Sequence, residues 1–187
     1  MNKYLAHLKT ICRHKSFVAH EMYMCGHPIQ GLLHDLTKFL PVEFFSSARY
    51  FQGDKSPIEA EKAELGYSRA WLYHKGHNPH HWEYWIDFNS KGETVPAKIP
   101  FHYVIEMVCD FIGAGKAYGE DKWTEAEPYD YFIKALGGRH YHPHTLILLY
   151  RLLSAIKDKG CREFYKIARG EAPYQLLELE YKEGLLK

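Results

Sequence analysis

Apolar residues recur every three or four positions along most of this sequence, and this helical period is the strongest constraint on its fold. The first segment, about residues 2–24, shows the period clearly and ends at the glycine and proline of "CGHP". Its apolar positions are Tyr4, Leu5, Leu8, Ile11, Val18 and Met22. The sequence shows no alternation of apolar and polar residues of the kind that marks a strand. We therefore expect an all-α, single-domain helical bundle, in which the helices bury their apolar faces against one another.

Prolines, glycines and capping residues divide the rest of the chain into further helices. Ser56 and Pro57 begin one helix, Asn78 and Pro79 begin another, and "FNSKGETVPAK" at 88–98 is the longest polar loop. The expected helices cover about 29–39, 41–51, 57–74, a segment from 79, 99–118, 124–136, 143–158 and 160–169. We treat 1–187 as one domain, with a core of about 2–170 and a weakly patterned tail at 171–187.

The charge of the chain is nearly balanced, which argues against one class of partner. The 187 residues include 24 basic and 23 acidic side chains, so the net charge is +1 and no broad basic field is present to bind extended nucleic acid. Apolar runs fall short of a membrane span, so no membrane partner is expected. The four cysteines are scattered and no secretory signal is evident, which predicts a cytoplasmic protein with reduced thiols. Homo-oligomerisation stays open.

Histidine is unusually frequent, with 13 residues, and one of them lies in the segment that is hardest to explain. In "LLHDLTKF", residues 32–39, the apolar positions predict a buried helix, yet the segment also carries His34, Asp35 and Lys38. Burial of an unpaired charge is costly, so these groups need a partner. A metal ion, an anion or other side chains would serve.

Further ionisable residues fall within the predicted helices or at their ends. Asp110 lies in the apolar run "YVIEMVCDFIGA" with no basic residue within one turn, so it must be paired in another way or act as a ligand. His80 and His81 are expected in the first turn of a helix, where free N–H groups favour an anion such as phosphate. Taken singly, each histidine is more typical of a hydrogen-bonded core residue. The candidate metal ligands are His20, His34, Asp35, His74, His80, His81 and Asp110.

The order of four of these residues resembles the pattern of the HD superfamily of metal-dependent phosphohydrolases. That pattern is a histidine, then a His-Asp pair, then a distant aspartate, all on helices of one bundle. The matching residues, across about 16–116, are His20, His34 with Asp35, and Asp110. The chain is also similar to small uncharacterised bacterial proteins of this superfamily.

Two further features resemble one branch of that superfamily, the branch that includes the HD-GYP cyclic-dinucleotide phosphodiesterases. "HDLTK" matches its HD-x-x-K sequence, and the pair His80-His81 resembles its paired histidines. No GYP sequence follows the pair, and His74 lies close before it. The resemblance implies two metal ions rather than one.

Imidazole and carboxylate ligands together suit one or two ions of Mn, Fe, Co, Ni or Zn. We expect the first ion to be held by His20, His34, Asp35 and Asp110, and the second by His74, His80 and His81, with Asp35 bridging. Such ions activate water and polarise a phosphoryl oxygen. The expected activity is hydrolysis of a small phosphorylated metabolite or nucleotide, as a phosphomonoesterase or phosphodiesterase. Asp35 and Lys38 are the candidate catalytic residues, and Lys38 and Arg139 the candidate substrate-binding residues.

Arg139 lies in "RHYHPH", where a solvated loop is the alternative to a rim of the site. Three other interpretations of the whole pattern also stay open. The same ligands suit a di-iron oxygenase of the HD type, or a non-catalytic module that binds a metal or a nucleotide. The third alternative is a helical protein whose core histidines are satisfied by hydrogen bonds. Convergence of the distant ligands in space would exclude this last alternative.

Overall fold

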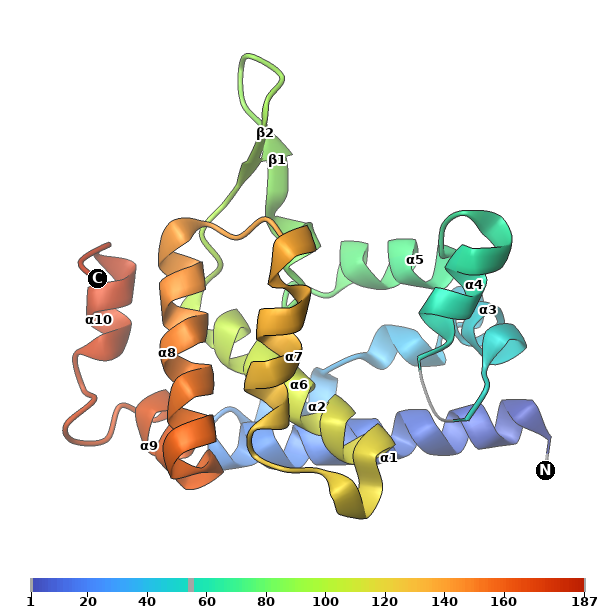
Figure 1. Cartoon of the computed structure of the whole chain (residues 1–187), viewed down its shortest axis with the longest axis horizontal. Helices are drawn as coiled ribbons and strands as arrows, with labels where there is room; N and C mark the ends of the chain where they lie inside the picture. The colour runs from blue at the N-terminus through green and yellow to red at the C-terminus, as the bar shows by residue number, and fades with distance from the viewer. Residues whose placement is uncertain (1, 54–55, 187) are drawn as a thin grey trace.

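The computed structural model describes residues 2–53 and 56–186, and there it confirms the all-α fold expected from the sequence (Figure 1). Short 3-10 turns join several helices, and two short strands form a hairpin. The helices are α1 (Lys3–Met24), α2 (Pro28–Leu33), α3 (Pro41–Tyr50), α4 (Pro57–Leu65), α5 (Arg69–His77), α6 (Phe101–Gly119), α7 (Glu127–Ala135), α8 (Pro143–Lys159), α9 (Cys161–Ala168) and α10 (Leu177–Lys182). The 3-10 turns are η1 (Leu36–Phe39), η2 (Trp82–Trp85), η3 (Glu120–Lys122) and η4 (Leu136–Gly138).

Helix α1 is the element against which the neighbouring helices assemble. It packs on α2, α3 and α6, and its Val18 and Met22 are fully buried. Two glycines permit the closest approaches, because a Cβ on Gly31 of α2 would lie 2.6 Å from Met22 Cβ and a Cβ on Gly113 of α6 would lie 2.4 Å from Val18 Cγ2. Helices α2 and α6 therefore lie directly against α1.

The apolar core lies between α6, α8 and α9 and is closed by the C-terminal segment. Helix α6 supplies Val104, Val108 and Ile112, all fully buried. The segment 171–187, expected as a weakly patterned tail, carries α10 and places Tyr181 in this core. The Tyr181 hydroxyl donates to the carbonyl oxygen of Ile99 at 2.5 Å, which ties the C-terminal segment to the residue two positions before α6.

The helix expected over 57–74 is instead two helices, α4 and α5, and the following segment also differs. Gly66 adopts a left-handed conformation with φ +78°, which ends α4. Helix α5 then continues through His77, so the four residues after it form a turn instead of beginning a helix. His80 and His81 therefore do not lie in the first turn of a helix, and the anion preference inferred from that position does not apply.

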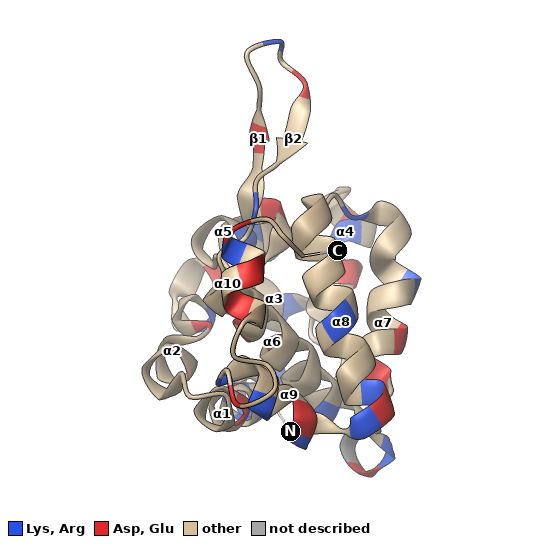
Figure 2. Cartoon of the chain, turned by 90° about the vertical axis from the view of Figure 1, so that its left-hand side faces the viewer, with Lys and Arg blue, Asp and Glu red and all other residues tan. Residues whose placement is uncertain are grey.

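The polar loop expected at 88–98 contains most of an antiparallel hairpin, β1 (Ile86–Phe88) and β2 (Thr94–Pro96). It projects from the helical body, as both views of the chain show (Figures 1 and 2). Asn89 supports the turn, because its side-chain oxygen accepts hydrogen bonds from the N–H groups of Lys91 and Glu93. Each strand has only three residues, which is too short for an alternation of apolar and polar residues to be recognised in the sequence.

The surface agrees with the balanced charge of the sequence. On the face seen in Figure 2, Lys and Arg are interspersed with Asp and Glu over α8, α9 and α10. Among the helices of the described residues, none combines the length and apolar character needed to cross a membrane.

Candidate metal centre

A break in the helical backbone places the His-Asp pair. The single buried helix expected over 29–39 is wrong: α2 ends at Leu33, η1 begins at Leu36, and Asp35 between them adopts a left-handed conformation with φ 54° and ψ 28°. Leu33 and Leu36 are exposed rather than buried. Lys15 of α1 stabilises the break by donating to the carbonyl oxygens of Leu32 and His34, both at 2.7 Å. The break lets two adjacent side chains turn inward, which a regular helix would prevent.

The pair meets two residues from other helices, and the four side chains form the first ligand group. Asp35 Oδ2 lies 3.2 Å from His34 Nε2 and 3.4 Å from His14 Nε2 of α1. Asp110 Oδ1 of α6 lies 3.1 Å from the same His14 nitrogen and 3.5 Å from that of His34. One atom of each residue lies within 4.8 Å of the others, so the four residues form a group that could hold a metal ion.

The histidine that α1 contributes is His14, and the expectation that it would be His20 is corrected. The buried face of α1 includes Ile11, His14, Val18 and Met22. His20 lies two residues after Val18, about 200° further around the helix, and its side chain is exposed. The apolar spacing of α1 contained this signal, since His14 falls on the same stripe as Ile11 and Val18.

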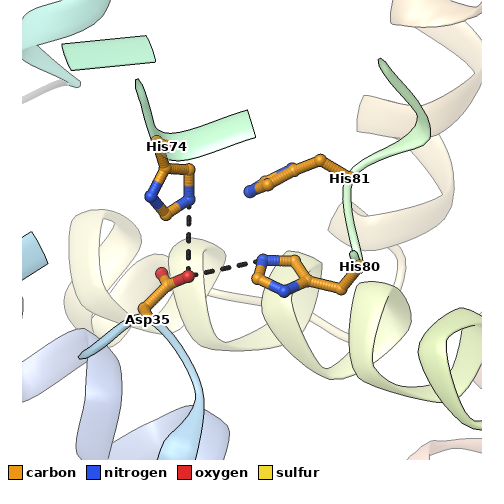
Figure 3. Close-up of side chains that lie close together, drawn as sticks. All are labelled: Asp35, His74, His80 and His81. Atoms are coloured by element: carbon orange, nitrogen blue, oxygen red, sulfur yellow. Dashed lines mark ion pairs between the residues drawn. The ribbon is translucent and has the colours of Figure 1, made fainter. Parts of the chain in front are cut away.

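The second group consists of Asp35, His74, His80 and His81, again with one atom of each within 4.8 Å of the others. His74 comes from α5, and the two consecutive histidines come from the turn after it. Figure 3 shows the Nε2 atoms of His74 and His80 directed at one oxygen of Asp35, with His81 beside them. Both distances to Asp35 Oδ1 are 3.4 Å. The structure thus brings together the histidines proposed for a second ion.

Asp35 belongs to both groups, and it uses a different oxygen for each. Its Oδ2 faces His14 and His34, while its Oδ1 faces His74 and His80. With metal–ligand bonds of about 2.1 Å, neighbouring ligand atoms are roughly 3.0–3.4 Å apart in octahedral or tetrahedral sites. The separations observed in the two groups, 3.1–3.5 Å, match that spacing. The arrangement would let Asp35 contribute one oxygen to each group.

Two glutamates that the sequence analysis did not single out fix the orientation of three histidines. Glu106 Oε1 lies 2.8 Å from His34 Nδ1 and 3.2 Å from His80 Nδ1, and Glu43 Oε1 lies 2.8 Å from His74 Nδ1. Each carboxylate can accept a hydrogen bond from Nδ1–H, and these contacts direct the Nε2 side of each ring toward Asp35. Carboxylates in this position are typical of metal-binding histidines. Glu106 carried a sequence signal, because it precedes Asp110 by four residues and shares its helix face.

Most of the candidate ligand atoms in the two groups lack hydrogen-bond partners in the described structure, although they are buried. A buried polar atom without a partner is costly, and a cation in their midst would satisfy all of these atoms together. The unpartnered atoms are both carboxylate oxygens of Asp35 and the Nε2 atoms of His14, His34, His80 and His81. These residues therefore fit a metal centre.

The charges of the centre also favour the binding of cations. Asp35, Glu43 and Glu106 are buried, and the Asp110 side chain is 14% exposed, so four carboxylates share a largely dry volume. Among the described residues, one ammonium forms an ion pair with these four carboxylates, that of Lys38. Its Nζ lies 2.5 Å from Asp35 Oδ2, but the two groups are not aligned for a hydrogen bond. Four negative charges thus meet one positive charge when the imidazoles are neutral.

The protonation states of most ligands suit metal binding. Burial raises the pKa values of Asp35 and Asp110, but adjacent imidazoles outweigh it, and both pKa values lie well below their usual range. Hydrogen bonds from two imidazoles likewise overcome burial and lower the pKa of Glu106 to about 2. Burial lowers the pKa values of His80 and His81, which keeps both imidazoles neutral. Ionised carboxylates and neutral imidazoles are the forms that bind metals.

His34 is the exception among the ligands. Burial lowers its pKa, but Asp35, Asp110 and Glu106 outweigh burial and raise the pKa well above its usual value. A proton on His34 and a metal ion compete for the same nitrogen, so ion binding at the first group releases a proton.

The groups border a cavity of about 830 Å³, whose wall includes the second-group histidines, His14, Asp110 and Lys38. Arg139, the other candidate substrate-binding residue, lines the same cavity, so its placement in a purely solvated loop is excluded. A cavity of this volume suits a ligand the size of a metabolite or a nucleotide.

Comparison with protein families gave one match. The model described as "Family of unknown function (DUF5662)" matches residues 3–155, a span that includes both ligand groups and Arg139. Neither curated proteins nor solved structures gave a match. The chain therefore belongs to the DUF5662 family.

Proposed function

We propose that this protein is a metal-dependent phosphohydrolase that acts on a small phosphorylated metabolite or nucleotide. The observation that carries the proposal is the shared carboxylate: Asp35 presents one oxygen to each of two histidine-containing groups. The resemblance of the His-Asp motif to HD phosphohydrolases points the same way. Its first histidine is replaced by His14, which leaves the ligand types unchanged.

The charge of the centre supports an anionic substrate. Two divalent ions add four positive charges, which turn the net charge of the four carboxylates and Lys38 from negative to a single positive charge. A partly buried positive centre next to a cavity attracts an anion such as a phosphoryl group.

The side chains have separable tasks in this proposal. Asp35 would bridge the ions, His14, His34 and Asp110 would complete the first, and the second-group histidines the other. Bound divalent ions supply Lewis acidity and lower the pKa of coordinated water. Lys38 is needed by neither ligand group, and its side chain, 27% exposed, lines the cavity. From there its ammonium can donate to a phosphoryl oxygen and offset charge that develops on it.

The proposal is tested by metal analysis together with two activity assays on the same preparations. We expect up to two ions of Mn, Fe, Co, Ni or Zn per chain, with phosphate release from members of a panel of phosphomonoesters, nucleotides and phosphodiesters. Oxygen uptake is measured beside phosphate release after aerobic and anaerobic purification. Oxygen uptake with an iron-loaded centre and no phosphate release would favour the di-iron oxygenase instead. A loaded centre without either activity would favour a binding module.

Lys38→Met separates a phosphate-processing centre from a merely metal-binding one, because it keeps the apolar stem and removes the charge. Phosphate release should fall about 10- to 1,000-fold, whereas the variant should stay folded and keep its metal content. Lys62→Met is the matched control, since Lys62 lines the same cavity but pairs with Glu59 at 2.8 Å. Equal rates for the Lys38 variant and the parent, at equal metal content, would reject the phosphate role of Lys38.

A further inference from the structure

The wall of the cavity carries a second cationic group, away from the ligand groups. Arg139 follows η4, between α7 and α8, and its side chain is partly buried. Phe111, the residue after Asp110, has its ring centroid 5.5 Å from the Arg139 guanidinium carbon and lines the same cavity. The metal centre and Arg139 therefore border one continuous space.

Arg139 is held in a fixed orientation by neutral groups. Its Nη1 donates to the Tyr141 hydroxyl at 3.2 Å and its Nη2 to the Tyr131 hydroxyl at 2.7 Å. The guanidinium carbon also lies 5.0 Å from the centroid of the Tyr131 ring, a cation–π contact that adds to that with Phe111. A side chain oriented in this way loses little further entropy when it binds a ligand.

The charge of Arg139 has no acidic partner among the described residues. The cavity wall carries two other Lys or Arg side chains, and both contact carboxylates: Lys38 contacts Asp35, and Lys62 contacts Glu59. Glu83 also lines the cavity, where burial raises the pKa of its carboxyl; the charge of Arg139 opposes that rise at longer range, without an ion pair between the two described side chains. A guanidinium has five N–H donors in a planar fork, and two tyrosine hydroxyls leave most of them for a carboxylate or a phosphoryl group.

We propose that the substrate of this centre carries a second anionic group, a carboxylate or a phosphoryl, which binds Arg139 while the reacting phosphoryl group lies at the metal centre. The inference rests on the proposed function and narrows its substrate class to compounds with two anionic ends.

The experiment uses phosphonates, because their P–C bond is not hydrolysed and binding is then measured apart from catalysis. The manganese-loaded protein is titrated calorimetrically with carboxyalkylphosphonates and alkane bisphosphonates of increasing chain length. Each is compared with the alkylphosphonate of equal length, which lacks the second charge. We expect at least one member of a series with two anionic groups to bind at least about 10-fold more tightly than the alkylphosphonate of equal length. The series that does so identifies the second group as a carboxylate or a phosphoryl.

Arg139→Gln should reduce this preference to less than about twofold, with the affinity for alkylphosphonates unchanged. Arg139→Lys keeps a positive charge but removes the planar guanidinium, and it should retain less than half of the preference for the ligand with two anionic groups. It serves as the second variant if Arg139→Gln is unstable. Arg162→Gln, on the exposed side of α9, is the control and should behave as the parent.

The inference is overturned if the parent shows no preference at any chain length, or if the preference is equal in the parent and both Arg139 variants. A preference that depends on Arg139, combined with no phosphate release from any phosphate ester, would instead overturn the proposed hydrolase and leave the anion site standing.

Discussion

Two buried carboxylates of this protein have opposite surroundings. Glu21 of α1 is fully buried, and each of its oxygens accepts one good hydrogen bond, from Lys116 Nζ at 2.6 Å and from the Tyr165 hydroxyl at 2.5 Å. Asp35 is equally hidden, but it faces four imidazoles and the Lys38 ammonium without making a hydrogen bond to any of them. Glu21 is satisfied by partners within the chain, whereas Asp35 and its neighbours are arranged so that a cation could bind among them.

Under the proposed function, the contrast separates a buried charge that stabilises the fold from one that binds metal. Glu21 lies on α1 and Asp35 lies in the break between α2 and η1, and either carboxylate would be costly to bury alone. The difference is the identity of the partners, since a lysine and a tyrosine are donors, while imidazoles held by glutamates present acceptor lone pairs. An acidic group surrounded by acceptors is satisfied by a metal ion.

The largest expected effect comes from Asp35→Asn, which tests the carboxylate shared by the two ligand groups. Asparagine tolerates the left-handed backbone and keeps the shape of the side chain, but it removes the bridging charge. We expect less than one ion per chain after desalting, and phosphate release lowered by at least about 1,000-fold, or roughly 4 kcal/mol. Mass spectrometric metal analysis and phosphate assays measure the two effects. Glu21→Gln is the matched control and should keep the metal content of the parent. Two ions per chain and full activity in Asp35→Asn would refute the bridging role.

Lys116→Met tests the other buried carboxylate, because it leaves Glu21 with a single hydrogen-bond partner. Its free energy of unfolding, from urea denaturation, should fall by about 3 kcal/mol, while metal content stays at the parental value. Lys157→Met is the control, because its pair with Asp130 is exposed and worth less than about 1 kcal/mol. Loss of metal in the Lys116 variant would show that the two carboxylates are not independent.

Glu106→Gln should weaken both ion positions, because one Glu106 oxygen orients a histidine of each group. We expect cobalt affinity at both positions to fall about 10- to 100-fold in a spectroscopic titration. Asp110→Asn provides the contrast, since Asp110 belongs to the first group alone and should weaken a single position. An effect of Glu106→Gln confined to one position would contradict the shared role.

His7 extends the comparison to a buried group with neither type of partner. Both of its ring nitrogens are buried and unpartnered, and it belongs to neither ligand group. Burial, with a contribution from Lys38, lowers its pKa from 6.5 to about 4. The unfolded chain then binds more protons between these values, so stability falls as the pH drops from about 6.5 to 4.

The expected loss is about 1–2 kcal/mol after allowance for solvent screening, measured as the difference in unfolding free energy between the parent and His7→Phe across that interval. Phenylalanine preserves the contacts with Phe44 and Phe51 and does not titrate. Parallel pH profiles of parent and variant would show that His7 is protonated equally in both states.

The fold followed from the sequence where a helix has a long, regular apolar face. Helices α1 and α6 were predicted within two residues at each end, because both bury a continuous stripe. Breaks were harder to predict. The break around Asp35 depends on tertiary hydrogen bonds from Lys15, which lies about 20 residues away along the chain, and Leu33 and Leu36 suggested a buried helix although they face solvent.

The candidate site followed from the sequence where residue type and apolar context agreed. Asp110 in an apolar helix and the His-Asp pair were both found in this way, and the structure brings them together. His14 was missed in favour of His20 because motif order was weighed above helix face. Glu43 was missed because nothing local distinguishes it from a solvated glutamate; only its contact with His74 does so.

The left-handed backbone of Asp35 has an evolutionary consequence. An L-residue pays about 1–2 kcal/mol for this conformation, and glycine pays nothing. Selection for stability alone would therefore replace Asp35 by glycine, which would also remove a buried negative charge. Under the proposed function, the aspartate persists only while its chemistry is selected. Position 35 should then be among the first to change in any lineage that has abandoned that chemistry.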